Sequence, residues 1–97
     1  MEYVALMRHS PESCPDSNAK VREQAQQALG KMEELGKKHQ VQPKSMHVLA
    51  PTHLTVAIFE AASIEAVRDY LQEGGLPQWN DIELYPSQTP QEAMQPH

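Results

Sequence analysis

The spacing of apolar residues changes along this chain in a fixed order, and that order limits the fold more than any other feature of the sequence. Four short runs have the alternation of apolar and polar residues, or the apolar and β-branched content, that is typical of strands. They occupy residues 2–9, 45–50, 53–61 and 81–86. Two segments between these runs have helical spacing instead, so we expect both strands and helices.

The two helical segments have recognisable boundaries. From Ala19 to about Lys38, apolar residues recur every three or four positions, as on one face of a helix. A cluster of Pro, Ser, Asp and Asn over residues 10–18 supplies the loop before it. Ser63 can cap a second, shorter helix that ends at a Gly-Gly pair. The elements therefore follow in the order strand, helix, strand, strand, helix, strand.

This order predicts an α+β fold of the ferredoxin-like, βαββαβ type with a four-stranded antiparallel sheet. Right-handed crossovers place the first and third strands side by side in the centre, the second and fourth at the edges, and both helices on one face. We expect a single domain over residues 1–88. Residues 89–97 are expected to form a C-terminal turn and tail, because Thr89 and Glu92 have the spacing of a capping box.

Alternation also divides the strand residues into two sets, one for each face of the sheet. We expect the helices to cover an aliphatic set: Val4, Leu6, Leu54, Val56, Ile58, Ile82 and Leu84. The opposite face then collects a mixed set: Tyr3, Ala5, Met7, His9, His53, Thr55, Ala57, Phe59, Asp81, Glu83 and Tyr85. This mixed set is too apolar for open water and too polar for a dry core, so we expect a partner to cover it and to leave a pocket.

With this element order and open sheet face, the chain resembles the dimeric α/β barrel superfamily over roughly residues 2–86. Members of that superfamily pair the open sheets of ferredoxin-like monomers, and they include small monooxygenases, haem-degrading enzymes and muconolactone isomerase-like proteins. The resemblance concerns the order and length of the elements and not a residue motif. It implies a homodimer or a higher homo-oligomer.

Composition excludes several classes of function. A formal net charge of -5 argues against nucleic-acid binding, which needs a basic face. No window approaches the roughly 18 apolar residues of a membrane span, and the first residues do not read as a signal peptide. No glycine-rich loop follows a predicted strand, so no nucleotide cofactor is expected. The single cysteine fits a reducing cytoplasm.

Three residues with metal-ligand chemistry are predicted to meet at the open edge of the sheet. The first strand ends beside the start of the antiparallel third strand, which brings His9 and His53 together on one face. Cys14 follows in a flexible, proline-bounded loop that leaves from the same edge. Two imidazoles and a thiolate can hold zinc, copper, nickel or iron and leave one position open. The sequence therefore predicts a small metal-binding protein, whose site is either catalytic or used to hold and deliver the ion.

His47 is a fourth candidate ligand, and its direction depends on how the chain turns before His53. If Pro51 occupies the second position of a tight turn, His47 faces the helices. A longer loop places it beside His53 instead. A one-residue difference in register decides between the two arrangements.

A metal-free reading of the same residues is also open. In it, the chain is a dimeric barrel enzyme of the monooxygenase or isomerase kind, or a binder of a small organic ligand. Its pocket would include Met7 and Thr55, with Glu83 as a proton acceptor and Tyr85 as a hydroxyl donor. A third reading is a structural dimer whose interior is simply filled by side chains. Cys14→Ser would be harmless in the metal-free enzyme or binder.

Overall fold

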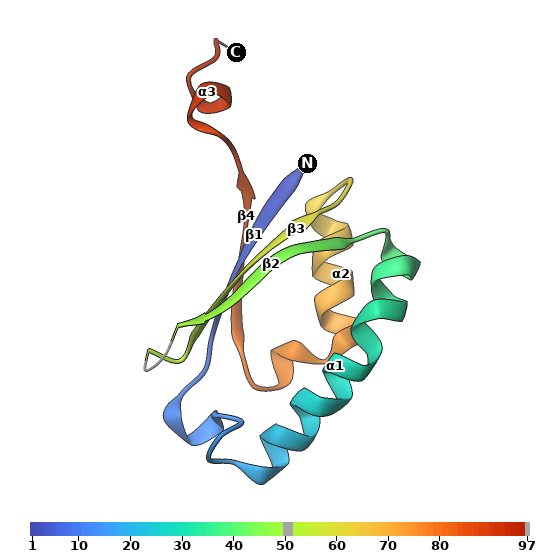
Figure 1. Ribbon diagram of the computed structural model, residues 1–97, viewed down its shortest axis with the longest axis vertical. Helices are drawn as coiled ribbons and strands as arrows, with labels where there is room; N and C mark the ends of the chain where they lie inside the picture. Colours follow the sequence, from blue (N-terminus) through green and yellow to red (C-terminus); the bar gives the residue numbers. More distant parts are fainter. Residues whose placement is uncertain (50–51, 97) are drawn as a thin grey trace.

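A computed structural model describes residues 1–49 and 52–96 of the chain (Figure 1). Its main elements are β1 (Glu2–Arg8), α1 (Ala19–His39), β2 (Gln42–Leu49), β3 (Leu54–Glu60), α2 (Ile64–Gly74) and β4 (Asp81–Ser87). Three short helices complete them: η1 (Pro11–Ser13), η2 (Leu76–Gln78) and α3 (Pro90–Ala93). The strands form one antiparallel sheet in the order β2-β3-β1-β4, with α1 and α2 on the same face. The predicted ferredoxin-like fold is confirmed.

Local sequence signals account for the ends of both long helices. The Asn18 side chain accepts a hydrogen bond from the backbone N–H of Val21 at the start of α1. Ser63 caps α2 in the same way, as its sequence predicted. Gly75 ends α2 with a φ of 83°, a left-handed conformation that glycine adopts without steric cost. These caps satisfy backbone groups that the helices themselves leave free.

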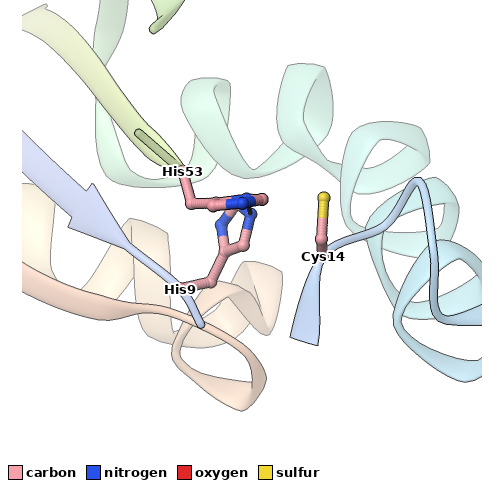
Figure 2. A group of neighbouring side chains, drawn as sticks. All are labelled: His9, Cys14 and His53. Carbon is pink, nitrogen blue, oxygen red and sulfur yellow. Dashed lines mark hydrogen bonds between the residues drawn. The ribbon is translucent and has the colours of Figure 1, made fainter. Parts of the chain in front are cut away.

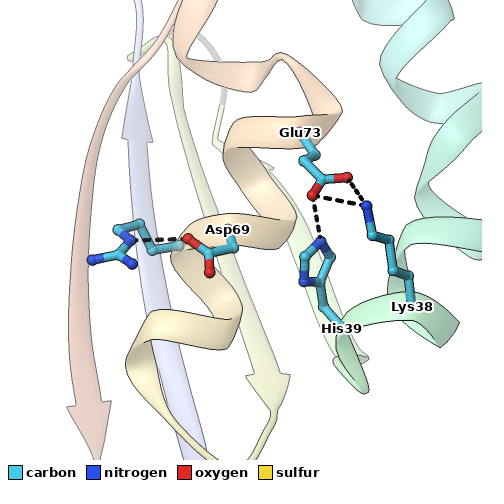
Figure 3. Close-up of polar contacts among 5 residues, drawn as sticks. Lys38, His39, Asp69 and Glu73 are labelled. Atoms are coloured by element: carbon cyan, nitrogen blue, oxygen red, sulfur yellow. Dashed lines mark hydrogen bonds and ion pairs between the residues drawn. The ribbon is translucent and has the colours of Figure 1, made fainter.

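An ion-pair cluster ties the end of α1 to the end of α2 (Figure 3). Lys38 Nζ donates to both carboxylate oxygens of Glu73, at 2.9 and 3.1 Å, and His39 Nε2 lies 3.1 Å from one of them. The hydrogen bonds from Lys38 hold the pKa of Glu73 below its ordinary value. A second pair in the same view, Arg68 and Asp69, lies within α2 alone. The first cluster links α1 to α2 at the ends of the two helices.

The expected assignment of the sheet faces is wrong for β1 and β3. The residues that these strands bury beneath the helices are Tyr3, Ala5, Met7, Ala57 and Phe59. The aliphatic set lies on the open face and is half-buried there: Val4, Leu6, Leu54, Val56 and Ile58. Alternation separates two sets of residues but does not say which set meets the helices, and here the larger aromatic rings form the core.

The β4 strand keeps its expected aliphatic residues, Ile82 and Leu84, toward the helices, but they share that face with Met7 and Ala5 and not with Val4 and Leu6. Ile82 pairs with Met7, and Tyr85 pairs with Val4. Tyr85 and Glu83 therefore share the open face with the aliphatic residues of β1. The β2 strand begins three residues earlier than expected, at Gln42, with an irregularity near Pro43 that an edge strand tolerates.

The C-terminal segment leaves the body of the protein. β4 continues beyond the sheet toward α3, which projects away from the other elements (Figure 1). Thr89 and Glu92 form the expected capping box. Among the described residues, no helix combines the length and the apolar character needed to cross a bilayer.

Candidate metal centre

His9 and His53 meet where β1 ends and β3 begins. The backbone N–H of His9 donates to the carbonyl of His53 at 3.2 Å, which extends the β1–β3 ladder by one residue beyond Arg8 and Leu54. The imidazole rings lie edge to face, with His9 Nε2 3.3 Å from His53 Nδ1. Figure 2 shows the two rings meeting from the two strand ends, with Cys14 beside them. The juxtaposition follows from the antiparallel pairing of the two central strands.

Cys14 reaches this position on a loop with its own hydrogen bonds. Its carbonyl accepts from the backbone N–H groups of Ser17 and Asn18, at 3.0 and 2.9 Å, which closes a tight turn. The guanidinium of Arg22 donates to the carbonyls of Pro15 and Asp16, both at 2.9 Å. These contacts tie the loop to the first turns of α1. One ligand atom from each of His9, Cys14 and His53 then falls within 4.8 Å of the others.

His53 has a backbone conformation that points to function. Among the described residues, it and Gln40 are the two non-glycine residues with positive φ, and Gln40 is the C-cap of α1. The left-handed region costs a non-glycine residue about 1–2 kcal/mol. Strained residues of this kind gather at functional sites, where the surrounding structure holds them in place.

His9 has a buried nitrogen without a partner. Its Nδ1 atom is enclosed and makes no hydrogen bond within the described part of the chain. Leaving such a group unpaired costs about 1–3 kcal/mol, so an orphaned polar atom in a native protein calls for an explanation. The other nitrogen of the ring, Nε2, faces Nδ1 of His53.

The spacing of the donors suits a metal ion. Two nitrogens bound at 2.0–2.1 Å to a tetrahedral ion lie about 3.4 Å apart, and His9 and His53 present nitrogens at 3.3 Å. A nitrogen and a sulfur on the same ion lie about 3.6 Å apart. The sulfur of Cys14 lies within 4.8 Å of one nitrogen of each histidine, so it must approach them more closely to complete such a site.

All three residues line one side of a cavity of about 520 Å³ between the sheet and α1. Its remaining walls are mostly apolar and include Ala25, Leu29 and Met32 of α1, together with Trp79 after η2. The cavity is therefore formed by the single chain on the helix-covered side of the sheet, where it is open to solvent beside the exposed Leu29 and Val48, and not at the open face where a pocket was expected. The sequence did not predict that α1 lines the pocket, because these strand residues were expected on the face away from the helices.

The other expected site residues divide between the two faces. Met7 and Thr55 line the cavity. Glu83 and Tyr85 do not, because they lie on the open face, where the Tyr85 hydroxyl donates to Glu83 at 2.7 Å and Arg8 pairs with the same carboxylate. The hydrogen bond to Glu83 raises the pKa of Tyr85 above its ordinary value. The proposed proton acceptor and hydroxyl donor are thus separated from the histidines by the sheet.

His47 lies away from the candidate centre. It pairs with Val56 in the β2–β3 ladder, one register position from the residues that share a face with His53. Its side chain is exposed on the open face. Of the four expected ligands, the structure brings together His9, Cys14 and His53 and leaves His47 out.

Comparison with known proteins finds similarity at the level of the fold. Neither a protein-family model nor the sequence of a curated protein matches the chain. A solved structure of SCO4226 from Streptomyces coelicolor A3(2) superposes with a TM-score of 0.58 and 16% identity, over 88% of this chain and 94% of that one. A structure of muconolactone isomerase gives a TM-score of 0.57 and 21% identity, over 93% and 92%.

The chain shares the backbone fold of these two structures. The expected resemblance is confirmed at the level of the fold, since it included muconolactone isomerase-like proteins. At these identities the likeness concerns the path of the backbone. The chemistry of the centre must be argued from His9, Cys14 and His53 themselves.

Proposed function

We propose that the protein binds a transition-metal ion through His9, Cys14 and His53. The observation that carries the proposal is the meeting of two imidazole nitrogens at 3.3 Å with a thiol within 4.8 Å, from three separate segments of the chain. Two nitrogens and one sulfur form a donor set of intermediate softness, suited to zinc, copper, nickel or iron. A thiolate ligand must stay reduced, which agrees with our prediction of a cytoplasmic protein.

Three protein ligands leave a position on a tetrahedral ion for water or a substrate. A metal-bound water can act as a nucleophile, and an open position can equally pass the ion to another protein. The cavity beside the histidines favours a use that involves a small molecule, because a storage site needs no such space. We therefore propose an open site with access to the cavity.

The second candidate is a metal-free, isomerase-like enzyme or a binder of a small organic ligand. The cavity of about 520 Å³ supports it, since its size falls in the range of ligand sites. In this case the His9–His53 pair would exchange protons with the ligand. Cys14 separates the two candidates, because it is a ligand in the first and a bystander in the second.

Cobalt(II) is a direct test, because it takes the place of zinc and its absorption reports the ligands. Titration of the reduced protein is expected to give intense thiolate-to-cobalt absorption in the near ultraviolet and visible bands of a four-coordinate ion. Cys14→Ser should remove the thiolate absorption while the two histidines still bind cobalt more weakly. Spectra of Cys14→Ser and unaltered protein that superimpose would exclude the thiolate as a ligand.

We also propose that a second copy of the chain covers the open sheet face. Val4, Leu6, Val56 and Ile58 form an aliphatic patch there that is half-buried in the single chain. The barrel fold supports the same arrangement, and burying this patch would remove apolar area from water.

Leu6→Lys tests the paired arrangement. The unaltered protein is expected to have twice the 10.9 kDa mass of the chain in light scattering, and Leu6→Lys to have the mass of one chain, because a lysine ammonium is costly to bury. Gln27→Lys is the control, since Gln27 is exposed on α1, on the other side of the sheet and outside the cavity lining. A single-chain mass for unaltered protein would contradict the proposal.

A further inference from the structure

We infer that the open position of the proposed ion is filled by a small organic monoanion whose apolar body occupies the cavity. The inference rests on the proposed metal function and adds the chemical class of the molecule that meets the ion. Three properties of the cavity carry it: its walls, the charge of the centre, and the charges of the other lining residues.

The walls select an apolar body. The cavity measures about 520 Å³, within the range of about 300–1,000 Å³ that is usual for small-molecule sites. Ala25, Leu29 and Met32 from α1 face Met46 and Val48 from β2 across it. Water in such a space makes few hydrogen bonds, so an apolar molecule that displaces it gains free energy.

The charge of the centre selects a monoanionic head group. A divalent ion with two neutral imidazoles and one thiolate has a net charge of +1. A positive centre beside apolar walls is poorly solvated, and one further negative donor makes it neutral. The acid among the described lining residues is Asp16, which is exposed and whose carboxylate is not among the three grouped ligand atoms. The described lining residues therefore supply no fourth, negative ligand that would neutralise the +1 charge of the centre.

The remaining lining residues make anion binding depend on the ion. None of the described lining residues is a lysine or an arginine. Without the ion, a carboxylate in the cavity would meet no lysine or arginine of the described lining and would stand near Asp16, since the guanidinium of Arg22 is already bonded to the carbonyls of Pro15 and Asp16. With the ion, the head group gains a direct bond. An uncharged molecule of the same shape gains only the apolar contacts, with or without the ion.

The fluorescence of Trp79 reports binding in the cavity, because Trp79 lines the cavity and is the one tryptophan of the sequence. Its fluorescence is followed at pH 8 while hexanoate, phenylacetate or the neutral hexanamide is added to metal-free and zinc-loaded protein. Zinc content is measured in the same samples. At least one of the two anions is expected to bind at least tenfold more tightly with zinc than without it, while the affinity for hexanamide stays the same.

A cavity-filling variant separates this inference from the metal site. Ala25→Phe adds a ring to the cavity wall and replaces none of the three ligands, so it is expected to keep its zinc and to weaken anion binding at least tenfold. Gln27→Phe, at an exposed position of α1 outside the cavity lining, should behave as the unaltered protein. Zinc-loaded protein that binds neither anion, or binds both equally without zinc, overturns this inference and leaves the metal proposal standing. Failure to retain zinc overturns both.

Discussion

Zinc at 100 times its dissociation constant is expected to raise the free energy of unfolding by about 2.7 kcal/mol. The folded chain holds His9, Cys14 and His53 together, whereas the unfolded chain separates them by up to 44 residues of sequence. For a domain of this length the gain corresponds to a rise in the thermal midpoint of about 10–20 °C. Differential scanning calorimetry with and without zinc measures it.

The controls for zinc stabilisation are histidine variants, because the fold brings His9 and His53 together and leaves His47 on the other face of the sheet. The double variant His9→Ala, His53→Ala should show no rise, and His47→Ala should show the full rise, because His47 lies on the other face. Protons compete with the ion for imidazole and thiolate, so the rise should shrink as the pH is lowered. A rise of equal size in the double variant would mean that zinc binds elsewhere.

Phe59→Ala is expected to lower the free energy of unfolding by about 3–5 kcal/mol. Phe59 is 1% exposed near the end of β3, beneath the helices. Its ring stands edge to face with that of Tyr70 of α2, with centroids 5.6 Å apart. Removing the ring takes away both the apolar burial and this aromatic contact, and it leaves a cavity that the surrounding residues fill only in part.

Urea unfolding followed by circular dichroism measures the effect. The neighbouring strand provides a control in Val48→Ala, because Val48 is 70% exposed and its truncation should change stability by no more than about 0.5 kcal/mol. If Phe59→Ala cost less than the control, the core would have to lie on the other face of the sheet, as the alternation alone had suggested.

The topology could be predicted from the sequence because each element has its own local signal. The helical spacing after Ala19, the cap at Ser63 and the strand-like runs define the order, and right-handed crossovers then leave few arrangements. Which set of strand residues faces the helices could not be predicted in the same way. Both sets of β1 and β3 residues contain apolar side chains, and the choice between them depends on packing with α1 and α2 across the whole domain.

The candidate site could be predicted in part for the same reason. His9 and His53 follow from antiparallel pairing of the two central strands, which needs no knowledge of side-chain packing. The place of Cys14 near this edge follows from the loop after His9. How closely it approaches the histidines depends on the hydrogen bonds of residues 14–18 and of Arg22, which no sequence pattern predicts. The cavity depends on the distance between α1 and the sheet, which is set by side chains from five elements and the loops between them.

The metal content of the protein tests the central claim most directly. Untagged protein, purified without chelator, is analysed for its elements beside the double variant His9→Ala, His53→Ala and the control His47→Ala. The unaltered protein and His47→Ala are expected to contain about one transition-metal ion per chain, and the double variant none. Unaltered protein that carries no metal and takes up none on titration, or a double variant that carries as much, would contradict the proposed centre.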